Sequence, residues 1–286
     1  MELILNELSM EQKFTGLDDF FEKFREVLKI YNLVLEENLL ILKPSNLYSI
    51  PLYDETNLNE IITNRQYSRK DEVRKYKSIL SKIVYQDPFW DISPLHKSTD
   101  RYLTKYTSKE NGFGLAESYE REQRVLSFST FEFGSIDSIK ISKNSIEEVE
   151  IKNFISLEDV CEQLYREGFI EIETYCKKRF KGTNLSFDRL EKTYGFDILN
   201  ATQKELYIKK FVEFSRMSWQ QIITSEGLNY KEYSPGKKSW FIGEEYYSKQ
   251  IMKFRINQKY RCFGYREGDI FMVLRFEIDH SISDNG

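Results

Sequence analysis

The chain is 286 residues long, which suits one large or two modest domains, and its 40% hydrophobic and 15% aromatic residues exclude a disordered state. A net charge of −4 gives the whole molecule no attraction for nucleic acid, and the apolar runs are too short to span a bilayer. With three cysteines, two histidines and no C-x-x-C pair, the sequence predicts a cytoplasmic protein that contacts no membrane and needs no metal or cofactor.

Strand and helix patterns alternate through the first part of the chain. The strands are expected over residues 2–8, 38–42, 124–131, 136–141 and 149–155. The helices are expected over residues 20–31, 58–62, 71–84, 115–122 and 157–165. The stretch 86–114 is rich in turn-forming residues and is predicted to be a loop. The alternation indicates a mixed α/β domain over residues 1–180, to which we assign a regulatory or sensing role.

A second domain is predicted over residues 195–286, after a break between Gly168 and Gly195 where the helical periodicity is interrupted. The basic run in this break is typical of a soluble linker, with contact to nucleic acid as the alternative. Helical spacing over 206–223 is itself interrupted, which indicates two helices, the second capped by Ser218.

Closely spaced strands are predicted at the end of the chain, after a turn at 235–238. They are expected over residues 251–256, 260–265 and 269–278. Because their connectors are about two residues long, the strands form antiparallel hairpins. The predicted fold class is therefore α+β, with a mixed α/β domain followed by a small antiparallel sheet packed against helices.

These strands carry a local excess of positive charge. Six basic residues and no acidic one lie between positions 249 and 266: Lys249, Lys253, Arg255, Lys259, Arg261 and Arg266. Alternation is expected to put Lys253 and Arg255 on one face, with apolar residues partly covering the other: Ile251, Met252, Phe254 and Ile256. Neighbouring aromatic residues suit the stacking of RNA bases beside bound phosphates: Tyr260, Tyr265, Trp240 and Tyr246. The alternative is a solvated face whose cations pair with acids of the first domain.

The run from Lys253 to Tyr265 resembles the central hairpin of RelE/YoeB-type toxins, the ribosome-dependent messenger-RNA interferases. The similarity lies in an Arg-Ile pair, a short turn, a Tyr-Arg pair and an aromatic-rich strand, within residues 200–286. The resemblance implies a metal-independent endoribonuclease with three catalytic residues: Arg261 as the phosphate-stabilising arginine, Arg255 as the basic residue of the preceding strand, and His280 near the C-terminal catalytic position. The acidic base of some members is expected at Glu244 or Glu245.

Cleavage of RNA through its own 2′-hydroxyl requires proton transfer and cationic stabilisation of the phosphorane, which suits His280 and the arginines. The alternative for His280 is an exposed tail residue. A toxin-like module joined to a larger domain suggests a bacterial toxin-like or anti-phage defence protein. Its expected partners are RNA or the ribosome, and an antitoxin or defence-system component. The rival hypothesis is a non-catalytic interaction or adaptor protein with a protein partner.

Two weaker patterns lie in the first domain. His96 with Asp91 and Asp100 suggests a divalent ion, against the alternative of a plain polar loop. The run from Leu115 to Phe128 is faintly similar to a motif of PIN-type nucleases, which hold magnesium with carboxylates, although Asn6 and Glu7 stand where the opening strand of that family has an Asp. We therefore expect the acidic residues of this helix to form a solvated face: Glu117, Glu120 and Glu122.

Overall fold

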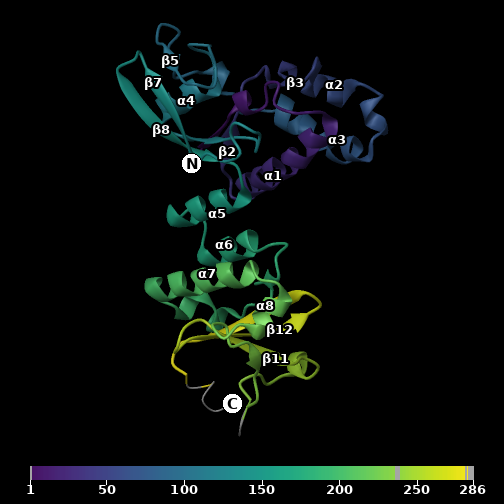
Figure 1. Cartoon of the computed structure of the whole chain (residues 1–286), viewed down its shortest axis with the longest axis vertical. Helices are drawn as coiled ribbons and strands as arrows, with labels where there is room; N and C mark the ends of the chain where they lie inside the picture. Colours follow the sequence, from purple (N-terminus) through teal and green to yellow (C-terminus); the bar gives the residue numbers. More distant parts are fainter. Residues whose placement is uncertain (1, 236–238, 281, 283–286) are drawn as a thin grey trace. The chain divides into compact units, whose positions relative to one another are not determined.

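The computed structural model describes residues 2–235, 239–280 and 282, and shows an α+β chain with helices and strands in both of its two compact units (Figure 1). Unit 1 comprises Met1–Gln163 and unit 2 comprises Leu164–Gly286. The segment between Gly168 and Gly195, expected to be a break, holds the helix α6 (Ile172–Arg179) and the strand β9 (Leu185–Ser186). Residues 236–238 of the turn expected at 235–238 lie outside the described residues.

Unit 1 is built on a mixed sheet of six strands in the described part of the chain. In sheet order they are β2 (Leu40–Leu42), β1 (Glu2–Leu5), β6 (Arg124–Leu126), β8 (Glu147–Phe154), β7 (Ser138–Lys143) and β5 (Tyr102–Leu103). The first four strands run parallel to one another, and β7 and β5 continue the sheet in antiparallel pairing. A separate ribbon is formed by β3 (Pro51–Tyr53) and β4 (Thr56–Asn57).

Helices cover both faces of this sheet. The helices of unit 1 are α1 (Leu17–Glu36), α2 (Leu58–Thr63), α3 (Asp71–Tyr85), α4 (Gly114–Arg121) and α5 (Leu157–Arg166), whose last residues belong to unit 2. The apolar stripe of α1 recurs every three or four residues and packs with α3 over one set of strand side chains: Leu5, Ile41 and Leu126. Alternate strand residues face α4 in a second buried cluster: Ile4, Leu42 and Val125.

Unit 2 holds a five-stranded sheet within the described residues. In sheet order the strands are β10 (Lys231–Glu232), β11 (Ile251–Arg255), β12 (Arg261–Glu267), β13 (Ile270–Glu277) and β9. The predicted antiparallel pairing of β11, β12 and β13 is confirmed, whereas β9 joins β13 in parallel. The two predicted helices are α7 (Ala201–Ser215) and α8 (Trp219–Thr224), and a capping box at Ser218 begins the second of them.

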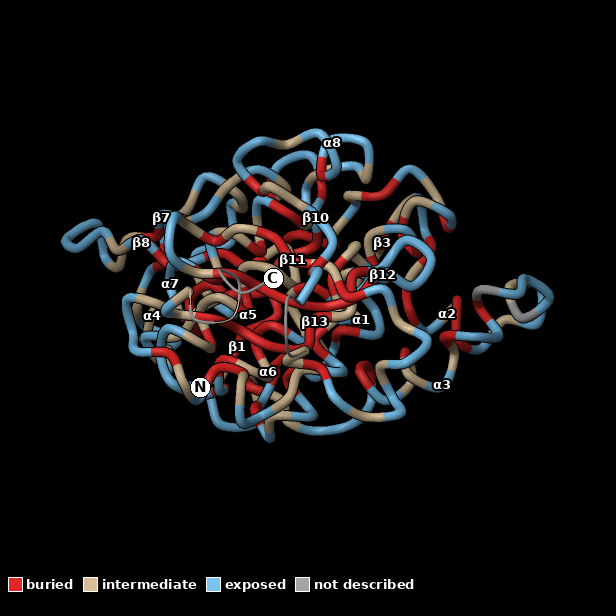
Figure 2. The backbone as a smooth tube through the Cα atoms, turned by 90° about the horizontal axis from the view of Figure 1, so that it is seen from below, coloured by how far each residue is buried: buried red, intermediate tan, exposed pale blue. Residues whose placement is uncertain are grey.

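The core of unit 2 lies between this sheet and α7. The ring of Phe254 on β11 packs edge to face against Phe211 and at a tilt against Phe214 of the helix, with ring centroids 6.3 and 4.7 Å away. Gly264 of β12 sits where the register with β13 shifts, and an added Cβ there would lie 2.2 Å from the carbonyl oxygen of Met272. Figure 2 shows how burial varies along the chain, with buried segments in red in the strands and exposed turns in pale blue.

Candidate functional site

The predicted basic face of β11 and β12 is largely covered. Ile251 lies on the same face as Lys253, not on the opposite face as expected, because residues two apart along a strand share a face. It belongs to an aromatic cluster with side chains from β12, β13 and the segment before β11: Tyr233, Phe241, Phe263, Tyr265 and Leu274, with Trp240 and Tyr246 packed beside them. Tyr265 is only 7% exposed, so its ring is not available to stack a base.

Several of the predicted RNA-binding cations are held by aromatic rings. The Nζ atom of Lys253, a residue that is 3% exposed, lies 5.6 Å from the ring centre of Tyr233. Lys249 lies over the ring of Tyr265 at 4.4 Å. Lys253 is therefore buried, and both cations contact aromatic rings of unit 2. The run of basic residues in the sequence does not reveal these contacts.

The remaining predicted contacts are more open. Arg266 stacks on Trp219 at 3.9 Å and its Nη2 atom lies 2.9 Å from Asp269. Lys259 is exposed in the turn between β11 and β12. Tyr260 is half-buried and stacks on Tyr207, with ring planes 16° apart. Lys259 is thus exposed to solvent and could contact a phosphate, whereas Arg266 is already paired with Asp269.

The three predicted catalytic residues gather at one end of the sheet. Arg255 and Arg261 are direct partners in the register of β11 and β12, so their side chains leave the same face. Arg261, which is 9% exposed, donates through Nη1 to the carbonyl oxygens of Asn257 and Tyr260 at 2.8 and 2.9 Å. Its Nη2 atom lies 3.1 Å from Nε2 of His280.

The imidazole of His280 has two neighbours at the same nitrogen. Besides Arg261, the carbonyl oxygen of Gln258 lies 2.5 Å from Nε2. An arginine only donates and a carbonyl oxygen only accepts, so Nε2 serves the first contact when it is unprotonated and the second when it carries a proton. The two contacts therefore require different placements of the proton on the imidazole, on Nδ1 for the contact with Arg261 and on Nε2 for the contact with Gln258.

A carboxylate that the sequence reasoning missed lies beside these residues. Glu277 of β13 is the register partner of Arg261 and is 3% exposed. Glu244 and Glu245, where the acidic base was expected, lie in the short helix η7 (Glu244–Tyr246) and are exposed. The sequence could have indicated Glu277, because pairing the last two strands as a hairpin brings this residue opposite Arg261, on the same face of the sheet.

The weaker patterns of unit 1 have different outcomes. Asp91 accepts from the backbone N–H and the hydroxyl of Ser45, and Asp100 pairs with Lys143 at 3.0 Å, while the carboxylate that holds His96 is that of Glu117. Within residues 2–235, 239–280 and 282, no group of three or more His, Cys, Asp or Glu side chains is placed to hold a metal ion.

The acidic residues of α4 do not form the solvated face that was expected. Glu117 is completely buried, Glu120 accepts from Lys143 and Tyr102, and only Glu122 is exposed. Burial opposes the ionisation of Glu117, but hydrogen bonds from His96, the backbone of Leu95 and Arg121 outweigh it and lower the pKa of this carboxyl. The helix turns these residues inward because the loop 86–114 folds over it.

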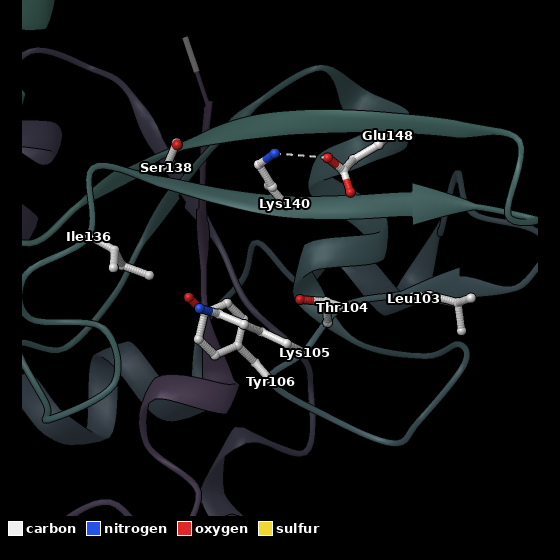
Figure 3. A pocket seen from close by; sticks show the side chains of 8 residues that line it. All are labelled: Leu103, Thr104, Lys105, Tyr106, Ile136, Ser138, Lys140 and Glu148. Atoms are coloured by element: carbon white, nitrogen blue, oxygen red, sulfur yellow. Dashed lines mark hydrogen bonds and ion pairs between the residues drawn. The ribbon is translucent and has the colours of Figure 1, made fainter.

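An open hollow of about 530 Å³ lies beside β7 and β5 of unit 1 (Figure 3). Its charged lining includes Lys140 of β7 and Glu148 of β8, which point toward each other and pair at 3.0 Å. Both side chains are more than half exposed, so their pairing contributes little, and the other charged side chain of the lining, Lys105, lies over the ring of Tyr106 at 5.1 Å. This hollow carries no arrangement of reactive groups.

Comparison with known proteins gives no relative to this chain. No family model matches it, and no curated protein and no solved structure is similar to it. Among the described residues, no helix is long and apolar enough to cross a membrane.

Proposed function

We propose that unit 2 binds RNA and cleaves it without a metal ion, through Arg255, Arg261 and His280. The observation that carries this proposal is the 3.1 Å contact between Nη2 of Arg261 and Nε2 of His280, with Arg255 opposite Arg261 on the neighbouring strand. It joins a permanent positive charge to an imidazole, a side chain that can both accept and donate a proton.

The two facing arginines support an anionic ligand at this end of the sheet. Like charges directly opposite each other on paired strands destabilise a sheet, and of the two arginines it is Arg261 that has a carboxylate, Glu277, as its register partner on β13. The Nε atom of Arg255 is also buried without a hydrogen-bond partner among the described residues. A phosphate oxygen would supply the acceptor that Nε of Arg255 lacks.

The proposed reaction is transesterification within the RNA strand. Neutral His280 takes the proton of a ribose 2′-hydroxyl, and the oxygen attacks the adjacent phosphorus to form a 2′,3′-cyclic phosphate. The bond to the 5′-oxygen breaks, and that oxygen receives a proton from the imidazolium. Arg261 and Arg255 stabilise the extra negative charge of the phosphorane. The resemblance to RelE/YoeB-type toxins implies the same division of roles.

The biological setting that fits this chemistry is a bacterial toxin-like or anti-phage defence protein acting in the cytoplasm. The protein would bind RNA that is either free or on a ribosome. An antitoxin or another defence-system component would inhibit its activity. Unit 1 would then have the regulatory or sensing role.

The direct test is cleavage of a labelled RNA by the purified full chain, with and without ribosomes. Arg261→Ala should lower the rate about 10²- to 10³-fold and His280→Ala about 10²- to 10⁴-fold, with a 2′,3′-cyclic phosphate in the wild-type product. Lys209→Ala, an exposed cation on α7, is the matched control and should leave the rate unchanged. A chelator should have no effect, and RNA with 2′-deoxy residues should stay intact.

Folding is followed by thermal melts of each variant, since Arg261 also holds the turn between β11 and β12. His280→Ala keeps the bonds of Arg261 to that turn and removes the contact of the imidazole with Gln258, so it separates catalysis from folding better than Arg261→Ala. Intact RNA with wild-type protein under both conditions, together with unimpaired growth of bacterial cells that express it, would overturn the nuclease proposal.

The second candidate is a non-catalytic interaction protein. Ile242 and Tyr247, which flank η7, are 65% and 82% exposed, and apolar side chains of this size are enriched where proteins dock. Changing both residues to Ser should then abolish capture of a protein partner from the native host, while Arg261→Ala should not.

A further inference from the structure

Unit 1 contains a small polar cavity at the carboxyl ends of β1 and β2. Its volume is about 270 Å³, and its lining includes Glu7, Glu11, Trp90, Asp91, His96 and Lys109. In sheets of parallel strands, ligands bind at this edge because the loops that follow neighbouring strands converge there. The chain leaves β1 through Asn6, whose side-chain amide donates to Ser127 at the end of β6 and so anchors the short helix η1 (Glu7–Ser9).

His96 is oriented in this cavity by a buried carboxylate. Its Nδ1 atom lies 2.6 Å from Oε2 of Glu117, and only 7% of its side chain is exposed. Glu117 is held in turn by the backbone N–H of Leu95 at 3.1 Å and by Arg121. With Nδ1 donating to this anion, Nε2 is the nitrogen that accepts a proton, and no described residue hydrogen-bonds to it.

Glu7 supplies the complementary group. Its Oε1 atom accepts from the backbone N–H of Gly114 at 2.7 Å, whereas its buried Oε2 atom has no hydrogen-bond partner in the described part of the chain. Burial raises the pKa of Glu7 to about 7, against the opposing effects of the Gly114 N–H and of Lys109. A carboxyl group that stays protonated near neutrality is a proton donor.

The other charges around the cavity select a reaction class. Glu11 and Asp91 line it with Glu7, and Nζ of Lys109 lies 3.5 Å from Glu11. With Glu7 protonated and Glu11 paired with Lys109, Asp91 leaves the lining with a net negative charge, which opposes the negative charge that develops in acyl or phosphoryl transfer. It favours the positive charge of an oxocarbenium-like transition state, which forms when a glycosidic bond breaks.

We propose that this cavity is an acid–base active site that hydrolyses the glycosidic bond of a small neutral glycoside, with Glu7 as general acid and His96 as general base. A water molecule gives one proton to Nε2 of His96, and its oxygen bonds to the anomeric carbon. The bond from that carbon to the leaving group breaks, and the leaving group takes the proton of Glu7. Proton exchange with solvent restores both side chains.

Glu117 is a positioning residue in this scheme, because it acts through His96. Its negative charge holds the ring orientation and stabilises the imidazolium that forms when water is deprotonated. The cavity volume limits the enclosed part of the substrate to about one sugar ring, which is small among ligand pockets.

The test is release of p-nitrophenol by the full chain from p-nitrophenyl β-D-ribofuranoside and p-nitrophenyl β-D-glucopyranoside. We expect turnover of at least one, and losses of about 10²- to 10⁴-fold for Glu7→Gln and for His96→Gln. Activity of the wild type should fall as pH rises through about 7, as Glu7 loses its proton; the charged groups that bear on it are Lys109 and Glu11, with His96 across the cavity.

Glu117→Gln should lower kcat and shift the pH profile, which a purely structural role of Glu117 would not do. Glu122→Gln, an exposed change at the end of α4, is the matched control and should change neither. Arg261→Ala should also leave this activity unchanged, so the outcome is independent of RNA cleavage. Release of p-nitrophenol from both probes at the rate of buffer alone would overturn the proposal.

Discussion

The two candidate sites hold their charged side chains in different surroundings. Beside the site of unit 2, several cations sit against aromatic rings, as Lys253 does over Tyr233 and Arg275 does over Tyr194 and Phe241. In unit 1 His96 and Glu117 hold each other by hydrogen bonds beside a cavity that Glu7 also lines. The dense run of basic residues over 249–266 therefore lies in a packed sheet of unit 2. In unit 1, residues far apart in the sequence, Glu7, His96 and Glu117, come together at a cavity.

The largest expected effect concerns the packing of the sheet of unit 2 at Gly264. An Ala there places a Cβ 2.2 Å from a backbone oxygen that cannot move without displacing β13, so Gly264→Ala should destabilise unit 2 by about 3 kcal/mol. Urea unfolding measures the loss. Gly268→Asn is the control, because an added Cβ meets nothing within 4 Å there and Asn tolerates its φ of +59°. Equal losses in the two variants would contradict the packing of β12 on β13.

The buried acid of unit 1 gives the next largest effect. Because the pKa of Glu7 is raised in the folded state, its contribution to stability is full below the unfolded value of 4.5 and is lost as pH rises to about 7, by up to about 3 kcal/mol. Urea unfolding across this pH range measures it. Glu7→Gln should flatten the decline, whereas Glu122→Gln should keep it.

The smallest effect is expected at the exposed cations of unit 2. Arg266→Ala removes a guanidinium that stacks on Trp219 at 3.9 Å, and should lower the free energy of unfolding by about 0.5–1 kcal/mol. RNA cleavage should change little, because Arg266 pairs with Asp269 and lies outside the Arg261–His280 pair. A large loss of cleavage in this variant would instead assign the RNA contact to the opposite end of β12, at the turn to β13.

Local patterns predicted what depends on neighbouring residues in the chain. The hairpins of β11 to β13 follow from alternation and short connectors, and the start of α8 follows from Ser218. The helix α6 was missed because its basic end resembles a linker. The loop expected over 86–114 contains only short elements, such as β5 and η4 (Trp90–Ile92).

Non-local packing explains what was not predicted. The cover over Lys253 comes from Tyr233 and its neighbours before β11, and no spacing within β11 indicates it. Glu117 looked like a surface residue because the helical pattern around it is short, yet His96 reaches it from 21 positions away. Such contacts join residues distant in the sequence, so they appear only once the loop has been folded onto the helix.

The most direct measurement is a ¹⁵N side-chain spectrum of the two histidines in the full chain, titrated with a single-stranded RNA oligonucleotide. The account predicts that RNA shifts the Nε2 signal of His280 and that Arg261→Ala abolishes the shift. His96 should keep its proton on Nδ1 and stay unchanged, because Glu117 holds it in another unit. An unchanged His280 signal at saturating RNA, or a shift confined to His96, would contradict the assignment of RNA binding to Arg255, Arg261 and His280.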